Sequence, residues 1–304
     1  MSDNPARPSI SFVVTTVGTT RVTQLQRLLR SIAEADGASF SETILVYQSL
    51  DGCVPARVDS AIAPCPGRRL IVAQPCGPSR ARNLGLRYAT GKVVAFPDDD
   101  CWYPPGTIGG VLAQFAASMV DCLCVCLADP ETGRPIGRRP RGRDFAVTRW
   151  NFMKVPIEPA TFFHRGLLLA QDPVFDERFG SSNRWGAGEG ADLVHRLLTA
   201  GARVRYDGNL AVYHPPSSAV AADRHKAYQY GLGTGVMAAR FLCARTFAHI
   251  PFFLDMLMRA AVGALLNALC GRWRKAGFYG NRLVGLLVGA AEGAAVFRGV
   301  SGLV

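Results

Sequence analysis

Three consecutive carboxylates, at residues 98–100, directly follow the short apolar run 93–96. Neighbouring carboxylates repel one another, and a divalent cation that also binds phosphate oxygens would compensate their charge, because hard oxygen ligands suit Mg²⁺ and Mn²⁺. A solvated acidic turn is the alternative interpretation. The triplet leaves a predicted buried strand and precedes the aromatic pair Trp102 and Tyr103, and this context favours a metal and phosphate site.

A second cluster of polar residues lies just upstream, where a helix is predicted from Ser79 to Tyr88. Arg80, Arg82 and Asn83 fall on its first turns. Guanidinium groups and the amides of a helix N-terminus both favour phosphate. These residues therefore predict a second part of a phosphate site, with an ordinary surface helix as the alternative.

An acidic pair and a histidine complete the residues that could do chemistry. Glu189 and Asp192 are three apart on a predicted helix over 188–200 and so share a face. Acids also stabilise a helix N-terminus, so one of the pair could be structural. A general base must be a carboxylate or histidine near the reacting hydroxyl, and this pair is the best placed after the triplet. His214, before two prolines, is a further candidate or a packed ring.

The elements that must position these residues alternate between strand and helix patterns. The expected strands cover residues 10–17, 43–47, 69–73, 92–96, 121–127, 203–206 and 210–213, and residues 154–164 are expected to be extended. This alternation predicts an α/β fold with a mainly parallel sheet. Ligands of such sheets bind at the carboxyl ends of the strands, which is where the acid triplet falls.

Two motifs together resemble family 2 glycosyltransferases. SRARNLG at 79–85 with the triplet at 98–100 resembles the nucleotide-sugar half, and GEGADL at 188–193 with the later His214 resembles the acceptor half. The resemblance covers about residues 9–216. It implies a GT-A fold, an inverting mechanism of a hexosyl- or deoxyhexosyltransferase, and a divalent metal (Mn²⁺ or Mg²⁺). It implies that Asp98 lies near the donor ribose and that Asp100 and His214 hold the metal. The expected donor-binding residues are Thr16, Arg80, Arg82, Asn83, Asp98 and Asp99.

Two positions depart from the family pattern. Members often carry Asp at the end of the second strand, where it reads the nucleobase, whereas this chain has Tyr47. The acceptor motif is commonly Glu-Asp, whereas this chain has Glu189 and Gly190. The base is therefore Glu189 or Asp192. We favour Glu189, because it holds the first position of the acidic pair and its longer side chain extends toward the place of the missing acid.

The C-terminal third is both basic and apolar. Residues 220–304 carry ten Lys and Arg against three Asp and Glu, which is +7 of the total net charge of +11. Residues 250–270 approach the ~20 apolar residues that span a bilayer, and Gly285, Gly289 and Gly293 form a stripe suited to close helix packing. The basic and aromatic run 272–275 is expected to lie between the two helices. A helical subdomain packed on the catalytic domain is the alternative.

These features predict a GT-A domain over 1–218 and a helical, membrane-associating region over 219–304. A basic, apolar region favours an anionic membrane surface over nucleic acid, so we expect no nucleic-acid partner. The expected location is the cytoplasmic face of the inner membrane, peripheral or partly embedded. The nine cysteines include no CxxC pair and favour a reducing compartment.

The sequence as a whole predicts an enzyme that moves sugar from a nucleotide-diphosphate donor to a glycan or lipid-linked acceptor, in surface polysaccharide synthesis. A chain with 49% hydrophobic and 19% charged residues is not a disordered protein. A metal-dependent nucleotidyltransferase is an alternative that leaves the 188–193 motif unexplained. A non-enzymatic basic membrane- or nucleic-acid-binding protein is another, and its binding would not depend on divalent metal.

Overall fold

The computed structural model describes residues 10–36, 41–117, 120–137, 140–155, 158–181, 183–215 and 223–298. The chain packs into two compact units. The first comprises Met1–Thr148, Lys154–Phe175 and Ala200–Pro216, and the second comprises Arg149–Met153, Asp176–Thr199 and Ser217–Val304. The boundary predicted after residue 218 lies outside the described residues and stays a prediction. The two units are discontinuous along the chain, and the segment with the acidic pair groups with the C-terminal helices.

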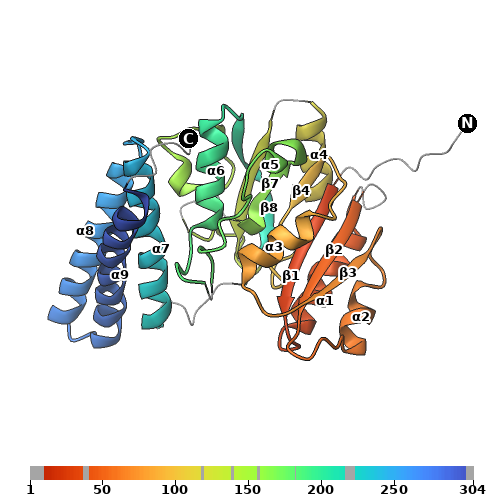
Figure 1. The fold of residues 1–304 in the computed structure, drawn as a ribbon, viewed down its shortest axis with the longest axis horizontal. Helices are drawn as coiled ribbons and strands as arrows, with labels where there is room; N and C mark the ends of the chain where they lie inside the picture. The colour runs from red at the N-terminus through yellow and green to blue at the C-terminus, as the bar shows by residue number, and fades with distance from the viewer. Residues whose placement is uncertain are drawn as a thin grey trace, which may run out of the picture. The chain divides into compact units, whose positions relative to one another are not determined.

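One eight-stranded sheet forms the centre of the first unit, in the order β3-β2-β1-β4-β7-β5-β8-β6 (Figure 1). The strands are β1 (Ile10–Val17), β2 (Ser41–Gln48), β3 (Arg69–Ala73), β4 (Val93–Ala95), β5 (Cys122–Ala128), β6 (Asp144–Val147), β7 (Thr161–His164) and β8 (Val204–Tyr213). β1 pairs in parallel with β2 and β4, as does β2 with β3 and β5 with β8. β7 and β6 are antiparallel to their neighbours. The predicted α/β fold with a mainly parallel sheet is confirmed.

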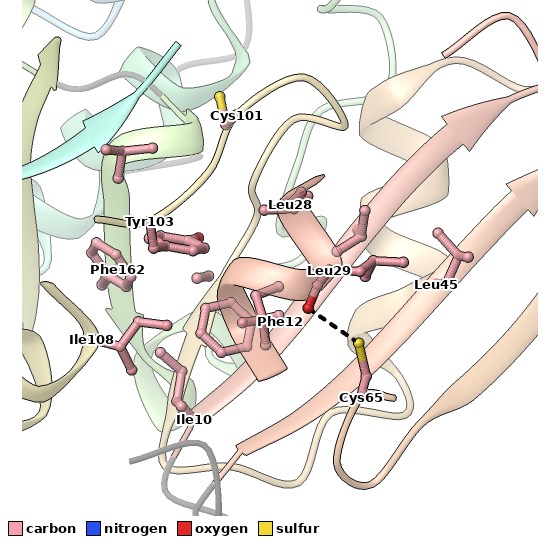
Figure 2. Close-up of a cluster of buried hydrophobic side chains, with 14 of the residues drawn as sticks. Ile10, Phe12, Leu28, Leu29, Leu45, Cys65, Cys101, Tyr103, Ile108 and Phe162 are labelled. Atoms are coloured by element: carbon pink, nitrogen blue, oxygen red, sulfur yellow. Dashed lines mark hydrogen bonds between the residues drawn. The ribbon is translucent and has the colours of Figure 1, made fainter. Parts of the chain in front are cut away.

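Helices pack the faces of this sheet through an apolar core. They are α1 (Val22–Ala33), α2 (Ala56–Ile62), α3 (Pro78–Leu86), α4 (Thr107–Ala116) and α5 (Arg165–Leu169). Figure 2 shows part of this core, where Leu28 and Leu29 of α1 lie with Phe12 of β1 and the Cys65 thiol donates to the Leu29 carbonyl. Fully burying an apolar side chain contributes about 1.5–3 kcal/mol. This core fixes β1 and β4, whose ends carry the polar residues described below.

Several local predictions are wrong in detail. The helix predicted from Ser79 to Tyr88 is α3, which begins one residue earlier at Pro78, after Gly77 at a φ of 80°, and ends at Leu86. Residues 203–206 and 210–213 belong to the single strand β8, which is irregular where it pairs with β5 at Val125 and Cys126. Part of the segment 154–164 is not extended, because a 3₁₀ turn at Glu158–Ala160 precedes β7. Sequence reasoning missed α2, α5 and β6.

The second unit is built from α6 (Glu189–Thr199), α7 (Arg224–Cys243), α8 (Ile250–Leu269) and α9 (Trp273–Phe297). α7 and α9 touch through their backbones. A Cβ on Gly285 would overlap the Tyr228 carbonyl oxygen, and one on Gly289 would overlap that of Leu232. The predicted glycine stripe is confirmed. The run 272–275 does not lie between two helices as expected, because α9 already begins at Trp273.

α8 is the helix of this unit with the least burial. Within the described residues it alone is long and apolar enough to cross a membrane by length and composition, and only 6% of its apolar window is buried. Ala260 is its one fully buried residue. Its exposed apolar side chains are Leu254, Met258, Val262, Leu265, Leu266 and Leu269.

The close approach of α7 and α9 can be tested by adding a single methyl group. We expect Gly289→Ala to lower the free energy of unfolding by about 1–3 kcal/mol, because the added methyl group forces the backbones of α7 and α9 apart. Gly280→Ala is the matched control on the same helix, since a Cβ there meets nothing within 4 Å. It should leave stability unchanged or raise it by up to about 1 kcal/mol. Urea denaturation of the full chain measures both, and equal stability of the two variants would contradict this packing.

Candidate functional site

The carboxyl ends of β1, β4 and β8 lie together in the first unit. Thr15 at the end of β1 bridges to Asp98, and Trp102 pairs with Tyr213 at the end of β8. The two residues of the second bridge exchange both backbone hydrogen bonds, at 3.0 and 2.9 Å. The segment after β4 therefore crosses to the end of β8. This crossing places the acid triplet beside His214.

Asp98 is held by an arginine from α3. Arg82 donates to its carboxylate at 2.9 Å, and the guanidinium also lies over the Phe175 ring. The Arg82 side chain is only 6% exposed, whereas Asp98 is 39% exposed. Asn83 uses both ends of its amide on the backbone of Phe175, at 2.8 and 3.0 Å. Arg80 on the same helix is exposed. Buried Arg82 of α3 is thus the cation that pairs with Asp98.

Asp99 is the buried member of the triplet. It accepts hydrogen bonds from Thr16 at 2.5 Å and from Arg21 at 2.9 Å. Burial raises the pKa of Asp99 above its usual range, although the bonds from Thr16 and Arg21 act in the opposite direction. Asp99 thereby ties the end of β1 to the end of β4. Sequence reasoning missed Arg21, and the available signal was a cation close behind a strand that ends at the same sheet edge.

Asp100 faces His214. The Asp100 Oδ1 and His214 Nε2 atoms are 3.4 Å apart, and Arg21 lies 3.1 Å from the other carboxylate oxygen. Burial alone would raise the pKa of Asp100, but the contact with His214 and the charges of His214 and Arg21 outweigh it and lower the pKa. The contact with Asp100 raises the pKa of His214, against its burial. His214 Nδ1 donates to the Pro215 carbonyl at 2.6 Å, which leaves Nε2 directed at the carboxylate.

These two side chains fit a divalent cation. Within the described residues, Asp100 Oδ1 is buried yet has no hydrogen bond of normal geometry. Ligand atoms of Asp100, Cys101 and His214 all lie within 4.8 Å of one another. Burial, followed by the nearby carboxylates, raises the pKa of the Cys101 thiol well above its usual range, so we assign the oxygen and nitrogen ligands to Asp100 and His214. A backbone carbonyl that fixes the ring through Nδ1 is the usual support for a metal-binding Nε2.

The acidic pair belongs to the second unit. Asp192 is 1% exposed, and its two oxygens lie 3.0 Å from Arg196 and 3.0 Å from Arg240. Arg240 also pairs with Asp176 at 3.1 Å. Glu189 is the first residue of α6 and is buried. Buried Asp192 therefore belongs to an ion-pair network with two half-buried arginines, which its spacing in the sequence did not indicate.

An aromatic cluster holds α6 in the second unit. The His195 ring stacks on Phe241 of α7 with centroids 4.0 Å apart, and Phe152 lies against the same imidazole. Burial, with smaller contributions from His249 and nearby arginines, lowers the pKa of His195 to about 4. His195 is therefore neutral near pH 7 and packs as an aromatic ring. The helix that carries the acidic pair is fixed by this cluster and by the ion pairs of Asp192.

The structure thus gathers part of the predicted site in one place. Thr16, Arg82, the triplet and His214 lie together in the first unit, with Arg21 as an addition. Asn83 contacts the backbone of Phe175. Glu189 and Asp192 are parts of the second unit.

A sequence profile and a curated relative both match this chain, and both describe glycosyltransferases. Residues 18–168 match the sequence profile described as Glycosyl transferase family 2. The pre-mycofactocin glycosyltransferase of Mycobacterium tuberculosis is 27% identical over 142 residues. That match covers 45% of this chain and 30% of the relative, so the chain spans less than a third of the length of the curated relatives it matches.

Solved structures share the fold. A mannosyltransferase from Pyrobaculum calidifontis, in complex with GDP-Man and Mn²⁺, superposes with a TM-score of 0.63 at 18% identity, over 93% of this chain and 88% of that chain. Residues 1–349 of S. aureus TarS in complex with UDP-GlcNAc give 0.55 at 17% identity, over 92% and 90%. These likenesses concern the fold, and the profile match concerns the family. Taken with the acids at the carboxyl edge of a mainly parallel sheet, they show that the chain belongs to glycosyl transferase family 2 and has a GT-A fold.

Proposed function

We propose that this protein is an inverting glycosyltransferase that moves a sugar from a nucleotide-diphosphate donor to a hydroxyl group of a glycan or lipid-linked acceptor, in surface polysaccharide synthesis. The observation that carries the proposal is the partnering of the acid triplet by Arg82, Arg21 and His214 at one sheet edge. The similar structures that hold UDP, UDP-GlcNAc or GDP-Man support a nucleotide-sugar donor.

The donor half of the proposed site uses the three acids differently. Asp98 is the most exposed and is oriented by Arg82, so it is the acid we assign to the donor ribose. Asp99 is a positioning residue, because Thr16 and Arg21 occupy its oxygens. Arg80 is exposed on the same helix and is the residue we assign to the donor phosphates, and Asn83 orders the backbone beside α3.

Asp100 and His214 are the residues that would hold Mn²⁺ or Mg²⁺. When bound, the cation supplies positive charge against the leaving nucleoside diphosphate. Arg21 keeps the carboxylates of Asp99 and Asp100 oriented through its two ion pairs. The Pro215 carbonyl keeps the proton of His214 on Nδ1, so that Nε2 faces Asp100.

Glu189 is the residue we assign as the general base. It takes the proton of the acceptor hydroxyl, whose oxygen forms the new bond to the anomeric carbon while the bond to the donor diphosphate breaks on the opposite face. One such displacement inverts the configuration. Asp192 stays the alternative base. Its two guanidinium partners favour a positioning role, because both oxygens are already engaged.

The second unit is proposed to associate with the anionic cytoplasmic face of the inner membrane, peripherally or partly embedded. α8 exposes a row of large apolar side chains. Trp273 is also exposed, in the first turn of α9 beside Arg272, Arg274 and Lys275. An apolar face with basic and aromatic residues at one end suits the boundary between headgroups and acyl chains.

The metal assignment predicts the effect of one substitution. Donor hydrolysis is measured with a panel of nucleotide sugars and Mn²⁺, and Mn²⁺ binding is measured separately by electron paramagnetic resonance. We expect Asp100→Asn to lower turnover at least 100-fold and to weaken Mn²⁺ binding with the fold intact. Asp59→Asn, which changes an exposed acid on α2, is the control and should retain both. Full activity of Asp100→Asn would show that this carboxylate does not serve the metal.

A comparison of two variants distinguishes the roles of Glu189 and Asp192. Removal of a general base lowers the rate by about 10²–10⁴-fold, so we expect this loss for Glu189→Gln with donor binding unchanged. Asp192→Asn should instead lower the free energy of unfolding by about 1.5–3 kcal/mol, because half-buried Arg196 and Arg240 lose a charged partner, while Arg240 keeps its pair with Asp176. Thermal unfolding and donor titration are measured on both variants. An inactive, fully stable Asp192→Asn together with an active Glu189→Gln would reverse the two roles.

The membrane association is tested on the exposed face of α8. We expect a triple variant with Leu254→Gln, Met258→Gln and Leu265→Gln to lose at least tenfold in partition onto phosphatidylglycerol vesicles, since each buried apolar side chain contributes about 1.5–3 kcal/mol. The control changes three exposed apolar residues of the first unit, Leu50, Val72 and Leu169, to Gln. Equal vesicle sedimentation of both variants and the unchanged protein would place membrane contact elsewhere or exclude it.

A further inference from the structure

An arginine-rich hairpin, residues 129–143, follows β5 and has no part in the site described so far. It carries five arginines against two acids. Arg134, Arg141 and Arg143 are described and exposed, while Arg138 and Arg139 lie outside the described residues. Among the described residues no carboxylate forms an ion pair with these three arginines. The hairpin is therefore a concentration of positive charge, although Asp129 interacts electrostatically with Arg134.

The internal hydrogen bonds of the hairpin leave this charge in place. The Asp129 carboxylate accepts from the Glu131 amide at 2.9 Å and the Thr132 hydroxyl at 2.8 Å, so it shapes the turn. Arg141 donates to the Gly133 carbonyl at 2.8 Å, which ties the returning arm of the hairpin to its tip. A carbonyl neutralises no charge. These bonds order the loop while its guanidinium groups keep their positive charge.

The sheet places the hairpin at the edge that carries the acid triplet. β7 is antiparallel to both β4 and β5, so β4 and β5 run in the same direction and end at the same edge. His214 donates its backbone N–H to the Ala128 carbonyl at 3.0 Å. Ala128 bridges in turn to Pro135, next to Arg134. The base of the hairpin is thus joined to the His214 backbone through a single residue.

The hairpin and the donor residues stand on opposite sides of the triplet. Thr16 and Arg82 come from β1 and α3, whereas the hairpin and His214 follow β5 and β8 at the other end of the sheet order. The cations on the donor side, Arg21 and Arg82, are already paired with the acids. A third donor-side cation, the exposed Arg80 of α3, is assigned to the donor phosphates. The arginines of the hairpin have no such role, and they lie on the side that remains for the acceptor.

We propose that Arg134, Arg141 and Arg143 of this hairpin bind a phosphate group carried by the acceptor. This inference rests on the proposed function, because it assigns the acceptor of that same site. Guanidinium groups form bidentate, charge-assisted hydrogen bonds with phosphate oxygens, and several together match a phosphate ester or pyrophosphate. The phosphate belongs either to a lipid carrier or to the acceptor glycan.

The experiment compares two triple variants of the full chain. The test variant is Arg134→Gln, Arg141→Gln and Arg143→Gln. The control is Arg30→Gln, Arg57→Gln and Arg87→Gln, which removes three exposed arginines from α1, α2 and the end of α3. The donor site is filled with the nucleoside diphosphate selected by the donor panel. Calorimetry then measures binding of farnesyl pyrophosphate against farnesol, and of glucose 6-phosphate against glucose.

We expect at least one phosphate probe to bind at least tenfold more tightly than its neutral counterpart. The hairpin variant should lose at least tenfold of that affinity, and the control should stay within twofold. Binding of farnesyl pyrophosphate alone would assign the phosphate to a lipid carrier, and binding of glucose 6-phosphate would assign it to the glycan. Donor hydrolysis without acceptor should be equal in all three proteins.

Three results would overturn the inference. They are unchanged phosphate binding by the hairpin variant, loss of donor hydrolysis in that variant, and a hairpin that affects only phosphatidylglycerol vesicles. The second would assign the arginines to the donor diphosphate and the third to a membrane surface. Failure of the unchanged protein to hydrolyse any nucleotide sugar would instead overturn the proposed function, and phosphate binding would still decide whether the hairpin is a phosphate site.

Discussion

The mutual repulsion of three adjacent carboxylates at the end of β4 is the constraint on which the site depends. Each acid has at least one partner, and Arg21 serves two of the three. Arg82 pairs with Asp98, Thr16 and Arg21 hold Asp99, and Arg21 and His214 face Asp100. An unpaired charge at a partly buried position costs several kcal/mol. When one partner is removed, the remaining partners therefore do not compensate the negative charge of the acid that lost it. The ion pairs therefore fix β1, α3 and the end of β8 relative to the end of β4.

The topology of the sheet explains how partners from distant parts of the chain meet. β7 is inserted between β4 and β5 and runs against both, so the two halves of the sheet keep the same direction. Their carboxyl ends therefore share one edge. The bridge from Trp102 to Tyr213 then joins the segment after the triplet to the end of β8. The acid triplet, His214 and the arginine hairpin are thus brought to one edge by backbone pairing.

Much of this arrangement could be predicted from the sequence, because it follows from local patterns. The runs that form β1 to β5 are apolar, short and separated by helical periodicity, and the acids stand where a buried strand ends. Arg21 was not assigned, because its partners lie far along the chain, and its position close behind the end of β1 was the one signal for it. Strand β6 lies among arginines and is exposed over much of its length, so only its pairing with β8 reveals it. The proposed assignment of different roles to Glu189 and Asp192 rests on the ion pair between Asp192 and Arg240. Spacing within α6 could not indicate this partner, because Arg240 lies on α7.

Diffraction from crystals of the full chain soaked with Mn²⁺ and a nucleoside diphosphate, recorded at the manganese absorption edge, tests the central claim most directly. We expect an anomalous peak about 2 Å from Asp100 Oδ1 and from His214 Nε2, with Arg82 still paired to Asp98. A peak elsewhere, or ordered nucleotide beside the triplet without any manganese peak, would contradict it.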